Sequence, residues 1–316
     1  MSSIKIILTG AGGQVGTELT HWLRARYGNA AVLATDMRPL EGSIAREGPT
    51  AQLDVLDHPS LRALILSHRP EQVYHLAAML SANAEKKPLL GWQLNMESLL
   101  TILELAREGY IGRIFWPSSI GAFGPNTPRE MTPQETIMDP STVYGISKMA
   151  GERWCAWYHR QYGVDVRSLR YPGLISYKTP PGGGTTDYAV HIFLEALRHG
   201  HYTSYLGPDT RLPMMYMDDA IKATIDLMHA PGAALSVRSS YNVSGISFSP
   251  AELAKAIQAR LPDVRIDYAP DYRQQIADSW PASIDDQVAR RDWNWQPLYN
   301  LARLVDAMLE GCAVKT

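Results

Sequence analysis

Short apolar runs alternate with segments of helical spacing along the first half of the chain. The first run, residues 4–8, is rich in β-branched side chains, and apolar residues then recur at helical spacing over residues 17–27. The same alternation predicts further strands at residues 31–36, 53–55, 72–78, 113–117 and 164–171, and further helices at residues 60–68, 91–109 and 142–162. Strands that alternate with helices form a parallel sheet covered on both faces, with ligands at the carboxyl ends of the strands. The pattern therefore predicts an α/β fold with a Rossmann-type doubly wound sheet.

The regular alternation ends after the strand that Pro172-Gly173 closes. Residues 179–186 read TPPGGGTT, a composition that no regular element could contain. Helices are predicted again over residues 187–200, from Tyr216, after the capping box Ser249-Pro250-Ala251-Glu252, and up to Gly311. We therefore expect a first domain over residues 1–174 and a smaller C-terminal α/β region over residues 175–316, some of whose segments return to the first domain.

Composition narrows the classes of partner. The chain has 316 residues, of which 45% are hydrophobic, and its net charge of −2 comes without a basic run, so we expect small-molecule partners rather than nucleic acid or a membrane surface. Cys155 and Cys312 are too few for a disulfide framework, and neither has the neighbours of a metal site. No signal peptide or bilayer-spanning stretch is recognisable. We expect a cytoplasmic protein without a metal.

A glycine-rich turn, residues 10–16, joins the first strand to the first helix. Its glycines, Gly10, Gly13 and Gly16, can make the tight turn, let the backbone approach a pyrophosphate, and pack the helix on the strand. A plain strand-to-helix connection is the alternative. Asp36 ends the second strand, where a carboxylate bonds the adenosine ribose and repels the extra phosphate of NADP. The cofactor is therefore expected to be NAD, although Arg38 argues weakly the other way unless it is a solvated surface residue.

Tyr144 and Lys148 are four residues apart, so on a helix they lie on one face. A phenol titrates near pH 10, and a nearby positive charge favours the phenolate, which could take the proton of a substrate alcohol. The same spacing occurs by chance in amphipathic helices. Ser118-Ser119 ends the strand before this helix and supplies a hydroxyl to hold the reacting oxygen; we expect Ser119 to do so, with Ser118 as the alternative.

Taken together, these motifs and their order resemble the extended short-chain dehydrogenase/reductase family over nearly the whole chain. Supporting matches are His75-Leu76-Ala77-Ala78, Asn95, Arg170-Tyr171-Pro172-Gly173 and Tyr216-Met217-Asp218-Asp219-Ala220. The resemblance implies catalysis by Tyr144, Lys148 and Ser119. It implies contacts to NAD from Gly10, Gly13, Gln14, Val15, Gly16, Asp36, Asp54, Val55, Leu76, Ala77, Ala78, Asn95, Tyr144, Lys148, Tyr171 and Pro172.

Within that family, residues 177–188 and 118–125 look like the corresponding segments of the L-threonine 3-dehydrogenases. That likeness implies oxidation of the side-chain hydroxyl of L-threonine to 2-amino-3-oxobutanoate. The implied substrate contacts are Ser81, Ser118, Ser119, Tyr144, Gly184, Thr185, Thr186 and Trp280. Glycine N–H groups and the two threonine hydroxyls of the loop could together hold a carboxylate. Ser81 could instead be a plain loop residue and Trp280 simple packing, and the acceptors for the substrate ammonium remain unidentified.

Two other functions stay open at this level. A nucleotide-sugar epimerase or dehydratase shares the same motifs but must hold a diphosphate with basic side chains, and Arg198, Arg211 and Arg273 show no motif for that role. A non-catalytic NAD-sensing protein would need the glycine turn but not the proton-transfer pair. Surplus aromatic and apolar residues on the helices at 91–109 and 142–162 further predict a homodimer through those helices.

Overall fold

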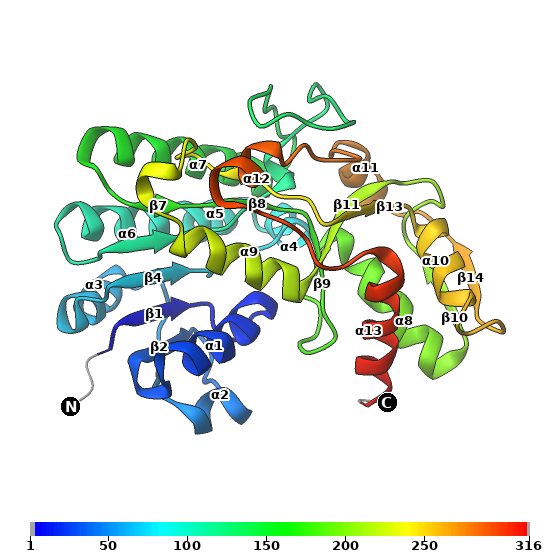
Figure 1. Cartoon of the computed structure of the whole chain (residues 1–316), viewed down its shortest axis with the longest axis horizontal. Coiled ribbons are helices and arrows are strands. Elements are labelled where there is room, and N and C mark those ends of the chain that lie inside the picture. Colours follow the sequence, from blue (N-terminus) through cyan, green and yellow to red (C-terminus); the bar gives the residue numbers. More distant parts are fainter. Residues whose placement is uncertain (1–3, 315–316) are drawn as a thin grey trace.

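The computed structural model describes residues 4–314, so the outermost residues of the two predicted domains, 1–3 and 315–316, lie outside the described part. Its largest sheet has six parallel strands in the order β3-β2-β1-β4-β5-β7 (Figure 1). These strands are β1 (Ile6–Thr9), β2 (Val32–Asp36), β3 (Thr50–Gln52), β4 (Gln72–His75), β5 (Arg113–Phe115) and β7 (Val166–Arg167). The order reverses between β1 and β4, as in dinucleotide-binding folds. The predicted Rossmann-type sheet is confirmed.

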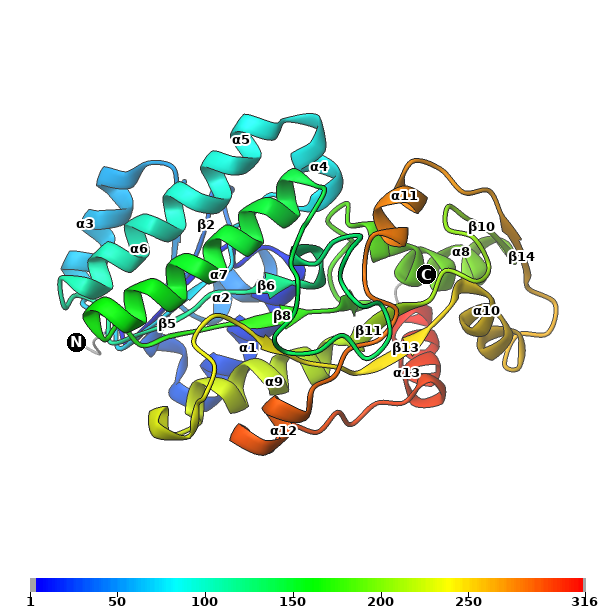
Figure 2. The ribbon, with the colours of Figure 1, turned by 90° about the horizontal axis from the view of Figure 1, so that it is seen from above.

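Helices cover both faces of this sheet. They are α1 (Gln14–Tyr27), α2 (Gly42–Glu47), α3 (His58–His68), α4 (Ser81–Lys86), α5 (Pro88–Trp92), α6 (Ser98–Arg107), α7 (Val143–Tyr162) and α9 (Met217–His229). Figure 2 shows α5 and α6 end to end, with α7 alongside them, on one face. Buried side chains of α3, α6 and α7 form one core there, and those of α1 and α9 form a second core on the other face. Both faces of the sheet are therefore buried under helices, which explains why the strands are continuous apolar runs.

Three predicted elements are interrupted, one of them the strand expected over residues 164–171, which divides into β7 in the main sheet and β8 (Leu169–Tyr171) outside it. The helix expected over residues 91–109 contains a π-helical turn, Gln93–Glu97, between α5 and α6. The strand expected over residues 113–117 leaves the main sheet after Phe115, and β6 (Ser118–Ser119) pairs instead with β8 (Leu169–Tyr171). Pro117 has no N–H to donate to a ladder, so the strand cannot continue through it. This break turns β6 out of the sheet and along α7.

The C-terminal region contains two small sheets that the sequence pattern did not predict. One has the order β13-β11-β9 and the other pairs β10 with β14. The strands are β9 (Gly173–Ile175), β10 (His201–Ser204), β11 (Leu212–Tyr216), β13 (Ile246–Phe248) and β14 (Arg265–Tyr268). The helices are α8 (Tyr188–His199), α10 (Pro250–Gln258), α11 (Arg273–Asp278), α12 (Gln287–Trp293) and α13 (Leu301–Ala313). The predicted capping box is confirmed, because Ser249 Oγ accepts from Glu252 N and Glu252 Oε2 accepts from Ser249 N.

Later segments of the chain pack against the main sheet. β12 (Tyr241–Asn242) pairs with β8, and α9 packs on α1. A separate apolar core lies among α8, α10 and α13, at the opposite end of the molecule in Figure 1. The boundary after residue 174 stays a prediction.

Candidate active site

The glycine turn follows β1 and leads into α1, at the carboxyl edge of the main sheet. Gly10 has a φ of +71°, and a Cβ there would lie 2.7 Å from Ala77 N. A Cβ on Gly16 would lie 2.2 Å from the carbonyl oxygen of Gly10, whereas one on Gly13 would meet that oxygen only at 3.4 Å. Two glycines are thus needed for the turn and for helix packing, and the third leaves the N-terminus of α1 open to an approaching anion.

Asp36 lies beside this turn. Its Oδ2 accepts a hydrogen bond of 3.0 Å from Gly12 N, and its Oδ1 accepts one of 3.2 Å from Arg38 N. The backbone of Arg38 therefore orients the carboxylate, while its side chain is exposed. Two further predicted cofactor residues lie on the next connection: Asp54 is exposed and accepts from Leu56 N, and Val55 is buried in the core under α3.

The loop that follows β4 is tied to the π-helical turn by Asn95. The Asn95 amide accepts from Met79 N at 2.8 Å and donates to Met79 O at 3.2 Å. It also donates to Ser147 Oγ at 3.0 Å, which connects it to α7. Asn95 therefore holds the half-buried backbone of Leu76, Ala77 and Ala78 against the helix that carries Tyr144. A π-helical turn at such a place is typical of functional sites.

His75 is a buried structural histidine. Its Nδ1 is 2.8 Å from Thr9 Oγ1 and its Nε2 is 2.9 Å from Ser98 Oγ. Burial, with a smaller contribution from the positive charge of Lys148, lowers the pKa of His75 to about 3. The ring is therefore neutral at physiological pH and links two strands of the sheet to α6.

Pro117 and the two residues of β6 that follow it each contact one residue of α7. The carbonyl oxygen of Pro117 accepts a hydrogen bond of 2.7 Å from Lys148 Nζ. The next residue, Ser118, donates to Glu152 Oε1 at 2.6 Å, and Ser119 interacts with the Tyr144 phenol. Ser119 rather than Ser118 therefore lies beside Tyr144, because alternate residues of a strand point to opposite sides.

Burial dominates the acid–base properties of the central pair. It raises the pKa of Tyr144 to about 12, an effect that the Ser119 hydroxyl partly offsets, and it lowers the pKa of Lys148 to about 7. The Lys148 ammonium is 5.5 Å from the centroid of the Tyr144 ring and is already hydrogen-bonded to Pro117 O. The expectation that Lys148 lowers the pKa of the Tyr144 phenol is thus wrong for the protein without cofactor, because desolvation raises that pKa and outweighs the attraction.

The glycine-rich loop at residues 179–186 closes on the glycine turn and on α4. Gln14 Nε2 donates to Thr179 O at 3.3 Å, and Asn83 Nδ2 donates to Gly182 O at 3.5 Å. Thr185 Oγ1 is 3.4 Å from Ser81 Oγ, and both side chains are buried. The structure thus brings together the loop, Ser81 and the turn, which are far apart in the sequence.

Part of the expected anion site in this loop is already used. Gly183 N and Gly184 N both donate to Asp187 Oδ2, at 2.9 and 2.7 Å. The expectation that these two N–H groups hold a substrate carboxylate is therefore wrong, because they already hold the carboxylate of Asp187. The hydroxyls of Thr185 and Thr186 remain the polar groups of the loop that could contact an anion.

Comparison with known proteins identifies the family. Residues 6–244 match the NAD dependent epimerase/dehydratase family. The chain belongs to this family. An uncharacterized epimerase/dehydratase of Staphylococcus saprophyticus is 51% identical over 309 residues, covering 97% of this chain and 96% of that protein.

Solved structures within the family are also similar. A partial consensus L-threonine 3-dehydrogenase superposes with a TM-score of 0.96 at 55% identity, covering 98% of this chain and 99% of the other. The holo form of a GalE-like L-threonine dehydrogenase from Cupriavidus necator gives a TM-score of 0.94 at 55% identity, with 97% and 99% covered. Like its family, this protein is an NAD-dependent oxidoreductase.

The residues of the turn fit NAD. Of the three turn glycines Gly10, Gly13 and Gly16, Gly13 is the one with room for a ligand beside its Cα. Asp36 presents a carboxylate that can accept hydrogen bonds from ribose hydroxyls. Tyr171 is a less direct contact, because its hydroxyl is bonded to Thr224 Oγ1 on α9, and Pro172 beside it is buried. Trp280 is buried in the C-terminal core, so its contribution to the site is through packing.

Sequence reasoning missed one acidic residue of the site. Asp187 directly precedes α8, and burial raises its pKa, although the N–H groups of Gly184 and Gly183 partly offset this. The only sequence signal was an acid placed at a predicted helix start.

Among residues 4–314, no group of three or more His, Cys, Asp or Glu side chains could hold a metal ion. None of the helices formed by these residues has the length and apolarity needed to cross a bilayer.

Proposed function

We propose that this oxidoreductase is an L-threonine 3-dehydrogenase, which converts L-threonine and NAD to 2-amino-3-oxobutanoate, NADH and a proton. The observation that carries the proposal is the closure of the loop at residues 179–186 over Ser81, through Thr185, next to the glycine turn. In this proposal, the closed loop holds a small polar substrate beside the cofactor. The similarity to solved L-threonine 3-dehydrogenases supports the same assignment.

In this proposal, Tyr144 in its phenolate form takes the proton of the substrate hydroxyl. Ser119 hydrogen-bonds the reacting oxygen and aims its proton at the phenol. Lys148 supplies the positive charge that favours the phenolate. Its hydrogen bond to Pro117 O fixes the ammonium beside the Tyr144 ring. NAD, when bound, supplies the acceptor for the hydride that leaves the carbinol carbon.

Asp187 is the acceptor that we propose for the substrate ammonium. The N–H groups of Gly183 and Gly184 both donate to Oδ2 of Asp187. Oδ1 can therefore accept a hydrogen bond from another donor. Ser81, Thr185 and Thr186 carry hydroxyls that can hold the substrate carboxylate, and Gly184 lies next to them in the loop. Replacement Asp187→Asn keeps the bonds to the glycine N–H groups but removes the charge, so KM for L-threonine should rise about tenfold or more, while NAD affinity stays unchanged. Equal KM values in the variant and the parent would remove Asp187 from this role.

The nucleotide-sugar epimerase alternative needs basic side chains for a diphosphate, and two of the three arginines named for that role are paired with acidic side chains; Arg198 is exposed near the end of α8. Arg211 is hydrogen-bonded to Ser247 O and to Glu252, and Arg273 is paired with Asp271 at 2.6 Å. These guanidinium groups are therefore already neutralised. No specific observation favours a diphosphate in the C-terminal region.

The deciding experiment is an NAD reduction assay with L-threonine, L-serine and UDP-glucose. We expect a steady rise in NADH absorbance with L-threonine, a slower one with L-serine, which lacks the methyl group, and none with UDP-glucose. An epimerase returns its hydride and shows no net NADH. No rise with L-threonine, together with conversion of UDP-glucose to its epimer, would establish the alternative.

We further propose a homodimer through α5, α6 and α7. Apolar side chains on α5 and α7 are unusually exposed for their size: Leu89, Leu90, Trp92, Ile146 and Trp154. Such a stripe along two adjacent helices is the surface that a second copy would cover. Light scattering should give twice the chain mass, and Ile146→Glu should give the single mass. The matched control Leu298→Glu changes an exposed leucine away from these helices and should remain a dimer.

A further inference from the structure

A buried carboxylate lies one helical turn beyond Lys148. Glu152 is completely buried, and Lys148 is 2% exposed. Residues four apart on a helix are neighbours on one face, so the two buried side chains lie on the same side of α7, although the ion pair of Glu152 is with Arg170. Ser118 Oγ donates to Glu152 Oε1 at 2.6 Å, so the carboxylate also fixes the residue that precedes Ser119.

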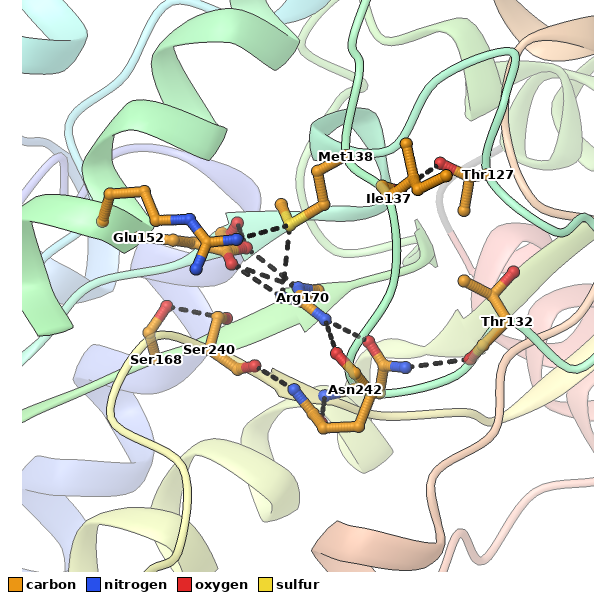
Figure 3. A network of polar contacts seen from close by, with 12 residues as sticks. Thr127, Thr132, Ile137, Met138, Glu152, Ser168, Arg170, Ser240 and Asn242 are labelled. Atoms are coloured by element: carbon orange, nitrogen blue, oxygen red, sulfur yellow. Dashed lines mark hydrogen bonds and ion pairs between the residues drawn. The ribbon is translucent and has the colours of Figure 1, made fainter.

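Arg170 of β8 is the principal partner of this carboxylate (Figure 3). Its Nε and Nη2 donate to Glu152 at 3.0 and 2.8 Å, in the two-pronged geometry of strong arginine–carboxylate pairs. Its Nη1 donates to Gln134 O at 2.9 Å and to Asn242 Oδ1 at 3.0 Å. The pair therefore joins α7 to β8, to the loop before α7, and to β12.

Glu152 is the negative charge that Lys148 faces at neutral pH. The groups around Lys148 are Tyr144, Glu152 and Cys155 of α7, His75 of β4, and the Trp116 ring, with Arg170 of β8 behind Glu152. Burial lowers the pKa of His75 and raises that of the Cys155 thiol, so both are uncharged near pH 7. Cys155 could attract the ammonium only as a thiolate. The Pro117 carbonyl and the Trp116 ring also favour the ammonium, but among the described residues named here Glu152 is the one whose formal negative charge opposes the effect of burial on the lysine.

We propose that Glu152, held by Arg170, is a positioning residue that keeps Lys148 in its charged form and aligns β6 with α7. The bonds from Ser118 and Arg170 hold the carboxylate where it acts on Lys148. The same bonds set the place of Ser119, which touches Tyr144. The pair is thus part of the catalytic apparatus without touching substrate or cofactor.

The direct test is the titration of Lys148 in the holoenzyme by NMR of ¹³Cε-labelled lysine. The Lys148 signal is assigned by its absence in Lys148→Arg. In Glu152→Gln, which keeps the size and the acceptor of Glu152 but not its charge, we expect the Lys148 midpoint to fall by at least one pH unit. This readout does not depend on the substrate, so it separates failure of this inference from failure of the proposed function.

Kinetics give a second readout. The alkaline limb of the kcat profile for L-threonine oxidation, where Lys148 loses its proton, should move to lower pH in Glu152→Gln by the same amount. In the Lys148→Arg background the limb should not move, because arginine stays charged. This arm rests on the proposed function.

Glu152→Gln leaves Arg170 without a buried anion and could unfold the protein. The double variant Glu152→Gln/Arg170→Met removes both charges and keeps the volume, so it separates folding from electrostatics. Its circular dichroism should match that of the parent, and the Lys148 midpoint should still be lowered. The matched control is Glu18→Gln, since buried Glu18 likewise accepts from a serine, Ser176, and a cation, Lys178, but lies on α1. An unchanged Lys148 midpoint in both folded Glu152 variants, or an equal shift in Glu18→Gln, would overturn the proposal.

Discussion

Gln14 and Thr179, which are 165 residues apart in the sequence, are joined by a hydrogen bond of 3.3 Å from the Gln14 amide to the Thr179 carbonyl oxygen. Gln14 is the first residue of α1 and part of the glycine turn, and Thr179 begins the loop that closes over Ser81. The bond therefore connects the part of the protein that holds the cofactor with the part that we propose holds the substrate.

Replacement Gln14→Ala should loosen the substrate loop. One neutral hydrogen bond contributes about 1 kcal/mol, so KM for the substrate should rise about fivefold, and amide exchange over residues 177–186 should be faster. Steady-state kinetics and hydrogen-exchange mass spectrometry measure these effects. Gln258→Ala removes a similar bond, to Val264 O on the far side of α10, and should leave both unchanged. Equal exchange in the two variants would contradict the prediction.

Alanine at Gly13 and at Gly16 should have different effects. A Cβ at Gly16 would lie 2.2 Å from Gly10 O, so Gly16→Ala should lower the thermal midpoint and abolish NAD binding. A Cβ at Gly13 meets only an ordinary contact within the protein, so Gly13→Ala should fold with a loss of at most about 1 kcal/mol but bind NAD much more weakly. Differential scanning fluorimetry and calorimetric titration with NAD distinguish the two. Normal NAD affinity in Gly13→Ala would show that the pyrophosphate does not approach there.

Replacement Tyr144→Phe should lower kcat by about 10²- to 10⁴-fold and leave NAD affinity nearly unchanged. Burial raises the pKa of Tyr144 to about 12, so the phenolate fraction should rise with pH, and kcat/KM should follow it until Lys148, whose pKa burial lowers to about 7, loses its proton. The residual activity of Tyr144→Phe should lack this rise. Tyr158→Phe alters another tyrosine of α7, whose hydroxyl bonds Glu104, and should keep the parent profile. A parent-like profile in Tyr144→Phe would assign the proton transfer to another group.

His75 should make the fold sensitive to mild acid. Its pKa is about 3 in the folded protein and about 6.5 when unfolded, so its contribution to stability is complete above pH 6.5 and is lost as the pH falls toward 3. The free energy of unfolding should decrease between pH 6.5 and 5 by up to about 1.4 kcal/mol per pH unit from this group. In His75→Gln that part of the slope should be missing, whereas the exposed His199→Gln should retain it. Urea denaturation at several pH values measures the slopes.

Local patterns were sufficient for the main sheet and for the order of its motifs. The run at residues 4–8, the glycine turn and the Tyr144–Lys148 spacing each follow from neighbours within a few residues. The interruptions were less visible, because the π-helical turn around Asn95 and the departure of β6 at Pro117 depend on what the segments pack against. The small sheets of the C-terminal region were missed because their strands are three to five residues long and pair at long range.

The sequence by itself determined the α/β architecture, and it named the glycine turn and the Tyr144–Lys148 pair as candidates for the cofactor site and the acid–base pair, since these depend on residue type and short spacing. Tertiary structure alone decided which of Ser118 and Ser119 lies beside Tyr144, and that the N–H groups of the loop belong to Asp187. It also decided the protonation of the pair. The charge of a phenol or an ammonium depends on how far folding removes it from water, and burial is a property of the whole packed molecule.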